Sequence, residues 1–174
     1  MAAPPRGNTG YGTYFITAST FQKQSLFQAE RMARLFLEVL LHYPKQGKYL
    51  LHEFVIMPDH FHLLISQTLT LERALQLIKG GLSFRAKKEL HFGGEIWQKS
   101  FYDRRVRDIN EYHAFREYIH RNPVRRGLVA AVQGYPYSSA WPEFVLDSLP
   151  QRLKPGHSDE RSNWKAGFGG GGFG

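Results

Sequence analysis

Two histidines stand two residues apart in the stretch MPDHFHLLI, residues 57–65. Strand-forming residues precede the pair at 54–56, a Pro-Asp pair favours a turn, and an apolar run of strand length follows. Alternate strand side chains share a face, so His60 and His62 point the same way with Cβ atoms roughly 6.6 Å apart. Two imidazoles at this spacing can bind one divalent cation. Two partly exposed histidines without a ligand would have the same pattern.

Tyr118 and Asn122 lie four residues apart in a second segment that we expect to be helical, so both can point in one direction. Two imidazoles plus one carboxamide oxygen form a sparse, mostly neutral ligand set that leaves positions open for water and phosphate oxygens. Such a set suits Mg²⁺ or Mn²⁺ better than a closed structural zinc site. A metal at His60, His62 and Asn122 could polarise a phosphodiester.

Tyr118 could then attack the phosphate in line and form a covalent phosphotyrosine that conserves the bond energy for rejoining. An unperturbed tyrosine has a pKa near 10, so the phenol must lose its proton to a base, to solvent or through nearby positive charge. The sequence does not identify that base. A tyrosine on an amphipathic helix is also often a simple packing residue.

The elements that must position these residues follow from apolar periodicity and from turn residues. We expect strands at 14–18, 49–56 and 60–66, with the last two forming an antiparallel hairpin and the histidines near its tip. We expect one helix at 28–43, ended by Pro44 and Gly47, and a second that is capped by Thr70, has Gly80-Gly81 in its middle and continues to about Lys88. The pattern of residues 97–107 predicts a loop that leads into a fourth strand. The next helix should begin at Asp108 or Asn110 and end at Asn122, because Pro123 disfavours helical geometry there, and Ser138 or Ser139 should cap a short final helix.

This order, βαββαβ followed by a helix, predicts an α+β fold of ferredoxin-like type with one antiparallel four-stranded sheet. Two helices should cover one face of the sheet, and the tyrosine-bearing helix should lie on or beside the other. We predict a flexible leader at residues 1–12, a catalytic domain at 13–149 and a polar, Gly-rich disordered tail at 150–174.

Composition narrows the kinds of site and of binding partner that the chain can have. The chain of 174 residues has no cysteine, which excludes disulfides and thiolate metal sites. We read no signal peptide and no apolar run near the roughly 20 residues needed to span a bilayer, and so expect a cytoplasmic protein. The net charge is +8, and residues 79–126 contain twelve Lys or Arg against six Asp or Glu. A basic segment interleaved with aromatics suits nucleic acid, although a solvated surface would share this composition.

Several motifs together resemble a known family. Residues 57–65 resemble the HUH motif (His, bulky hydrophobe, His) of the single-tyrosine transposases, and 118–128, YIHRNPVRRGL, look like the tyrosine helix of their REP-associated branch. Segments 97–104 and 135–141 also resemble that branch, and the similarity spans roughly residues 13–142. Two positions depart from it: Asn122 replaces a glutamine ligand, and Tyr102 stands where many relatives have histidine.

The resemblance implies a ferredoxin-like enzyme that cuts and joins single-stranded DNA beside small hairpins of repetitive extragenic palindromes. It implies a 5′-phosphotyrosine intermediate, a free 3′-OH and a Mg²⁺ or Mn²⁺ cofactor. His60 and His62 would be metal ligands, Asn122 a third ligand and Tyr118 the nucleophile. We expect a monomer, associated with the nucleoid when bound to DNA. Candidate phosphate contacts are Lys79, Arg85, Arg104, Arg105, Arg107, Arg121 and Arg125.

Two other functions remain open at this point. The first is a non-catalytic module that only holds hairpin DNA or structured RNA. The second is a metal-dependent nuclease that uses activated water, with Tyr118 in a structural role. The products of a cleavage reaction would separate all three.

Overall fold

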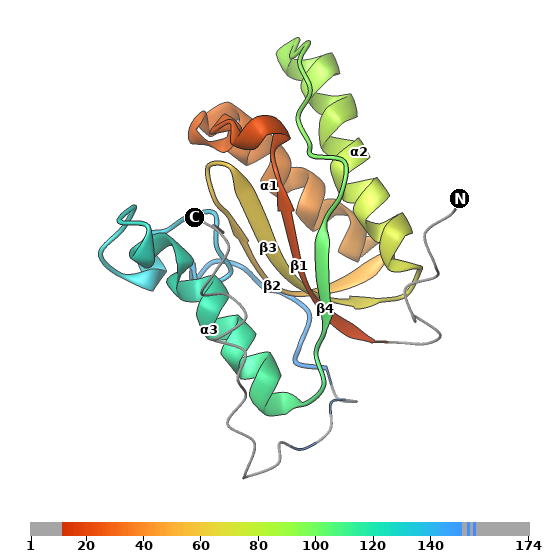
Figure 1. Ribbon diagram of the computed structural model, residues 1–174, viewed down its shortest axis with the longest axis vertical. Helices are drawn as coiled ribbons and strands as arrows, with labels where there is room; N and C mark the ends of the chain where they lie inside the picture. Colours follow the sequence, from red (N-terminus) through yellow and green to blue (C-terminus); the bar gives the residue numbers. More distant parts are fainter. Residues whose placement is uncertain (1–11, 151–152, 154, 156–174) are drawn as a thin grey trace.

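Four antiparallel strands form the centre of the computed structural model, which describes residues 12–150, 153 and 155. The strands are β1 (Thr13–Ser19), β2 (Tyr49–Ile56), β3 (His60–Gln67) and β4 (Tyr102–Arg105), in the spatial order β2-β3-β1-β4. Helices α1 (Glu30–Lys45) and α2 (Leu71–Leu90) lie together on one side of the sheet, and α3 (Ile109–Arg125) lies on the other (Figure 1). The predicted α+β fold with a four-stranded antiparallel sheet is confirmed.

The register of the strands decides which side chains reach which face. His62 pairs with Thr17 of β1 and with Val55 of β2, and His60 pairs with Ser19. Directly paired residues share a face, so this row points toward α3. The intervening residue, Phe61, instead joins the larger core beneath α1 and α2.

The larger core is sealed by a close approach of α1 to α2. A Cβ added at Gly81 would lie 2.7 Å from Tyr43 Oη and 2.9 Å from Val39 Cγ1, both on α1, whereas one at Gly80 would meet nothing within 4 Å. Only the second glycine of the pair is therefore required by packing. Three short 3-10 helices, Phe21–Lys23, Leu26–Gln28 and Val132–Gly134, complete the elements of the described residues.

The ends of two helices differ from the prediction for one shared reason. Pro44 lies inside the last turn of α1 and Pro123 inside the last turn of α3, so neither proline ends its helix. Each helix instead stops before a glycine with positive φ, Gly47 (φ 71) and Gly127 (φ 70). Glycine takes this left-handed geometry without a Cβ penalty and commonly closes a helix. The prediction that α3 ends at Asn122 was wrong, because tertiary packing of buried Asn122 and Pro123 overrides the local preference.

The starts of α2 and α3 follow the predicted capping. Thr70 Oγ1 accepts a hydrogen bond from Arg73 N at 3.2 Å, and Asp108 Oδ1 accepts one from Glu111 N at 2.8 Å. Asp108, rather than Asn110, is therefore the cap of α3.

The short final helix expected after Ser138 or Ser139 does not form, which corrects that prediction. Residues 137–139 instead lie along the outer edge of β2, where Ile56 N donates to Tyr137 O and Ser139 N donates to Phe54 O. An exposed strand edge presents unpaired backbone groups, and this segment satisfies them. The Ser139 hydroxyl serves that contact by accepting a hydrogen bond from Phe54 N, and the Ser138 hydroxyl accepts one from Ala140 N.

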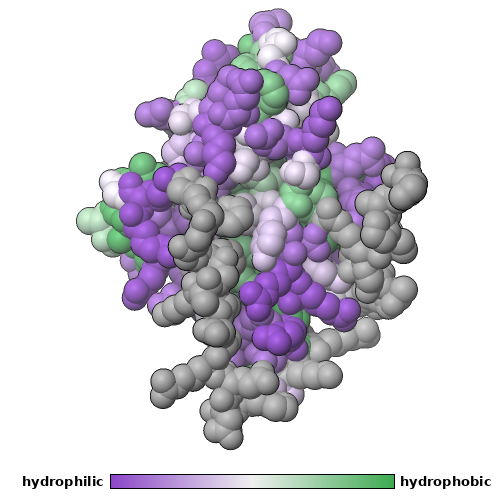
Figure 2. Space-filling model, in the orientation of Figure 1, coloured by the Kyte–Doolittle hydropathy of each residue, from purple (hydrophilic) through white to green (hydrophobic). Residues whose placement is uncertain are grey.

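The visible face of the molecule is mostly hydrophilic, with hydrophobic residues in small groups between the charged ones (Figure 2). Within the described residues, no helix combines the length and apolarity needed to cross a bilayer. Most of the predicted leader and of the predicted tail lies outside the described residues. Leu153 is described and packs against the core beneath α3.

Candidate metal and nucleophile site

His60 and His62 are both buried, with 3% and 0% of their surface exposed, and their ring centroids lie 4.8 Å apart. The Nε2 atom of each ring has no hydrogen-bond partner among the described residues. A buried polar atom without a partner is costly and is uncommon in native proteins. Both imidazoles therefore present a buried nitrogen that a ligand would satisfy.

The opposite ring nitrogens are held by neighbours. His60 Nδ1 lies 2.7 Å from Asp59 Oδ1, and His62 Nδ1 lies 2.7 Å from Thr17 Oγ1. An ionised carboxylate can only accept a hydrogen bond, so His60 Nδ1 is the donor and Nε2 is the nitrogen left to face a ligand. Partners of this kind orient metal-binding histidines and set their tautomer.

The electrostatic surroundings keep His62 neutral. Burial lowers the pKa of His62 well below its ordinary value, and the nearby His60 and Arg125 lower it further. Burial raises the pKa of Asp59, but its hydrogen bond with His60 and the charge of Arg126 outweigh that effect and lower it overall. His62 is therefore held neutral, the form in which an imidazole binds a metal, and Asp59 is held ionised beside His60.

Helix α3 brings Tyr118 and Asn122 to the same place. The Tyr118 ring packs edge-on against His62, with centroids 5.2 Å apart, and the Arg125 guanidinium lies 4.3 Å from the ring centroid on α3 itself. The next residue, Arg126, reaches Asp59 at 3.5 Å. Asn122, one turn after Tyr118 on α3, is 2% exposed, and its Oδ1 has no hydrogen-bond partner among the described residues.

These three orphaned atoms are chemically able to serve as ligands of a divalent cation. The described residues contain no group of three His, Asp or Glu arranged for a metal, so the candidate set is the two imidazoles and one amide oxygen. The donors are neutral and few. Such a set leaves positions for water and phosphate oxygens, as Mg²⁺ and Mn²⁺ sites on nucleic-acid enzymes require.

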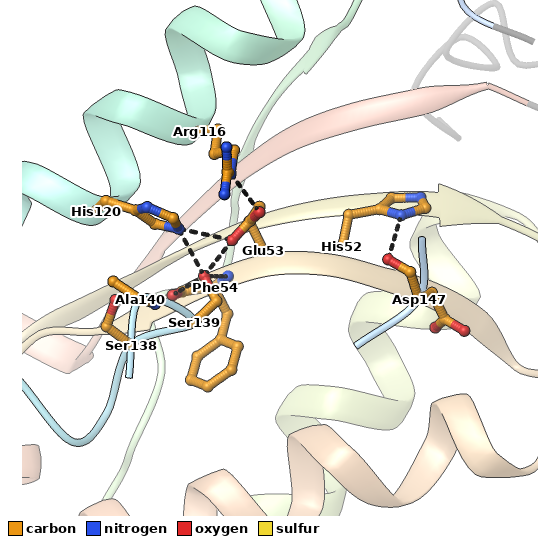
Figure 3. Close-up of polar contacts among 9 residues, drawn as sticks. All are labelled: His52, Glu53, Phe54, Arg116, His120, Ser138, Ser139, Ala140 and Asp147. Atoms are coloured by element: carbon orange, nitrogen blue, oxygen red, sulfur yellow. Dashed lines mark hydrogen bonds and ion pairs between the residues drawn. The ribbon is translucent and has the colours of Figure 1, made fainter. Parts of the chain in front are cut away.

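A buried carboxylate anchors α3 to the sheet. Glu53 of β2 accepts hydrogen bonds from Arg116 Nε at 2.9 Å, from His120 Nε2 at 2.7 Å and from Ser139 Oγ (Figure 3). Ser139 Oγ and the carboxylate contact the same nitrogen of His120, so this cluster lacks the relay of a Ser-His-acid triad. It instead joins β2, α3 and the 137–139 segment, with Tyr118 between its two α3 members.

Comparison with known proteins decides the family. A family model described as "Transposase IS200 like" matches residues 11–122, well over half of the chain. The chain belongs to the IS200-like transposase family. An Escherichia coli REP-associated tyrosine transposase is 23% identical over 136 residues, covering 74% of this chain and 76% of that protein. A Haemophilus influenzae protein provisionally given the same name is 26% identical over 161 residues, covering 84% and 89%.

Among solved structures, one described as a REP-associated tyrosine transposase bound to a REP hairpin has a TM-score of 0.64 and 22% identity. It covers 79% of this chain and 82% of that one. At this identity the structural similarity supports the fold. With the sequence matches, it confirms the predicted resemblance to REP-associated tyrosine transposases.

The basic residues proposed for DNA contact in this IS200-like transposase divide into two groups. Four have partners within the fold: Lys79 donates to Gln98 O at 2.6 Å, Arg85 pairs with Glu38 and Glu89, and Arg104 and Arg107 contact Glu111. The other three are exposed: Arg105, Arg121, which forms a surface pair with Glu117 at 3.3 Å, and Arg125 beside the Tyr118 ring. The structure thus leaves Arg105, Arg121, Arg125 and the outward part of Arg107 as the more accessible cations.

Sequence reasoning missed the residues that orient the histidines. Asp59 is adjacent to His60, so its role had a local signal in the Pro-Asp-His order. Thr17 lies 45 residues from His62 along the chain and had none. Glu53 also lacked a signal, because its partners come from two distant segments.

Proposed function

We propose that this transposase cuts and rejoins single-stranded DNA beside a hairpin, with Tyr118 as the nucleophile. The main support is that the Tyr118 ring packs against His62 beside three buried atoms that lack a hydrogen-bond partner among the described residues and could bind a metal. These atoms are His60 Nε2, His62 Nε2 and Asn122 Oδ1. Family membership supports the reaction class, and the hairpin-bound relative supports the choice of DNA.

In the proposed reaction, the Tyr118 oxygen attacks a backbone phosphorus while the bond from phosphorus to the 3′ oxygen breaks. The phenol loses its proton, the departing 3′ oxygen gains one, and the 5′ phosphate remains on the tyrosine. A 3′-OH from another end then attacks the phosphotyrosine, which rejoins the strand and frees Tyr118. A divalent cation, Mg²⁺ or Mn²⁺, held by His60, His62 and Asn122 would polarise the phosphate and neutralise developing charge.

The chain's own residues perform the positioning in this scheme. The Glu53 cluster holds α3 against β2 on either side of Tyr118. Phe15 stacks on Phe115 and His62 and meets the Tyr118 ring edge-on, which confines the ring to one orientation. The Arg125 guanidinium over that ring places positive charge beside the attacking group. We further propose that the enzyme acts as a monomer, since all four site residues come from one chain.

The test uses purified protein, labelled single-stranded hairpin oligonucleotides, and Mg²⁺ or Mn²⁺, with products separated on a denaturing gel. We expect a slow-migrating protein–DNA adduct that requires metal and is absent from Tyr118→Phe. The matched control is Tyr112→Phe, since Tyr112 is also a buried tyrosine of α3 but its ring packs edge-on against His52 and His113, which are not in the candidate ligand set. Cleavage that survives Tyr118→Phe would favour a hydrolytic nuclease. Binding without any product from several hairpins would favour a non-catalytic binding module.

A further inference from the structure

The edge of the sheet next to the candidate site contains a break in pairing. Tyr102 of β4 pairs with Thr17, and further along the same edge Gln98 N donates to Ser19 O while Trp97 bridges Thr20. The three residues 99–101 therefore face a single residue of β1, Ala18. Figure 1 shows this connection running from α2 down the edge of β1 into β4. Such bulges are frequent at sheet edges beside active sites, where they re-aim a side chain.

The bulge opens a hollow of about 610 Å³, which we call the edge hollow, between β1, the 3-10 helix Phe21–Lys23 and residues 95–102. This volume falls within the range of roughly 300–1,000 Å³ typical of small-ligand sites. Its lining combines the aromatic rings of Phe21, Phe101 and Tyr102 with two lysines, Lys23 and Lys99, and one carboxylate, Glu95. Tyr102 lies on the edge strand β4 and is 41% exposed.

The hollow is adjacent to the candidate metal ligands. Tyr102 pairs with Thr17, and Thr17 pairs with His62, so the three side chains form one row on the α3 face. Neighbouring strands are about 4.8 Å apart, which places Tyr102 roughly 10 Å from His62 across the sheet. Thr17 also lines the hollow and contacts His62 directly. A DNA strand crossing from one to the other would need about one to three nucleotides, at roughly 3.4 Å per stacked nucleotide.

We propose that the edge hollow binds an unpaired nucleobase of the DNA strand that is cut at Tyr118, with the Tyr102 ring as its stacking surface. This proposal rests on the DNA-cleaving function proposed above and adds a subsite to it. Every nucleobase has a π-face that stacks on an aromatic ring, and lysines beside such a ring contact the flanking phosphates. Lys23 and Lys99 take that place in the lining, and the partly exposed Tyr102 ring lines the same hollow beside the bulge.

The experiment measures binding of the full-length chain to a fluorescein-labelled DNA hairpin with short single-stranded arms, and to the same hairpin without arms. We expect Tyr102→Ala to weaken binding of the armed hairpin by about 5- to 150-fold, the loss of one stacked base. Tyr102→Phe should bind as the wild type does, because the ring is kept. Phe84→Ala is the matched control, since Phe84 is also an exposed aromatic (67% against 41% for Tyr102) but lies on α2, outside the hollow.

A single abasic site is then moved along the arms. At one position it should weaken the wild type but have no further effect on Tyr102→Ala, because base and ring act as a pair. A 2-aminopurine at that position should lose fluorescence on binding the wild type, a readout that does not depend on how well any variant folds.

Equal binding by Tyr102→Ala and wild type would overturn the subsite. So would a loss of the same size with the armless hairpin, or additive effects at every abasic position. In each of these cases a metal-dependent adduct on Tyr118 would leave the proposed function standing. Failure of the wild type to bind any hairpin or to form an adduct would overturn both.

Discussion

Replacing Glu53 by glutamine should loosen the helix that carries Tyr118. The side chain keeps its shape but loses the charge that Arg116, His120 and Ser139 share. Hydrogen bonds to charged groups contribute about 1.5–3 kcal/mol each when buried. The Arg116 side chain is 49% exposed and its pair with Glu53 is screened by solvent, so its share is small. We therefore expect the free energy of unfolding to fall by about 2–3 kcal/mol, largely through His120 and Ser139.

The loss of stability in Glu53→Gln should also depend on pH. Burial raises the pKa of Glu53, but its contacts with His120, Ser139 and Arg116 outweigh burial and hold the pKa below the ordinary 4.5. A carboxyl group whose pKa is lower in the folded state than in the unfolded state stabilises the fold at pH values above its unfolded-state pKa. That stabilisation is lost as the pH falls through the folded-state pKa. The difference between wild type and Glu53→Gln should thus be full near neutral pH and shrink below about pH 4.5.

Urea unfolding at neutral and acid pH measures both effects. Glu117→Gln is the matched control, because Glu117 is an exposed residue of α3 that pairs with Arg121 at 3.3 Å and should change stability by only about 0–1 kcal/mol. The reasoning is refuted if the two variants lose the same stability, or if the Glu53→Gln deficit is unchanged in acid. Adduct formation by Glu53→Gln under folding conditions should also drop, because Tyr118 lies between the two anchored residues of α3.

Three further predictions follow from particular contacts. Gly81→Ala should lower the free energy of unfolding by about 1–3 kcal/mol, because the added methyl group would overpack against α1. Gly80→Ala should raise it by up to about 1 kcal/mol through helix propensity. Thermal unfolding distinguishes the two variants, and equal effects would contradict the packing argument. Thr17→Val should weaken Mn²⁺ binding about 10- to 100-fold in calorimetry by freeing the His62 ring, and unchanged affinity would remove Thr17 from the site. Arg121→Ala should reduce the slope of log affinity for DNA against log salt by about 1, while Arg85→Ala, whose side chain pairs with Glu38 and Glu89, should leave that slope unchanged.

Local patterns in the sequence predicted the fold and the elements that carry the candidate site, but they gave no signal for Thr17 or Glu53. The strand containing His60 and His62 and the caps Thr70 and Asp108 depend on neighbours within a few residues, so local chemistry specified them. The helix ends depended on a competition between proline and glycine, which packing decided. Residues 137–139 followed a free strand edge that no local pattern reveals.

The basic side chains show the limit of composition most clearly. Counting charge between residues 79 and 126 located a basic region, but it could not separate Arg85, which pairs with two carboxylates, from Arg121 on the surface. Partners distant in sequence make that distinction. The metal ligands, the nucleophile and the cofactor remain predictions of the sequence that the geometry supports.

The turn between β2 and β3 sets a limit on length as well as on sequence. Met57 N donates to His60 O at 2.8 Å across Pro58-Asp59, so the hairpin closes with no spare residue. Strand side chains alternate, and a shift by one residue exchanges the two faces. An insertion or deletion of a single residue that was absorbed as a shift of β3 would therefore turn both imidazoles toward the core beneath α1 and α2 and bring Phe61 to the face that α3 covers. Natural variants of this chain should tolerate substitutions here more readily than changes in loop length.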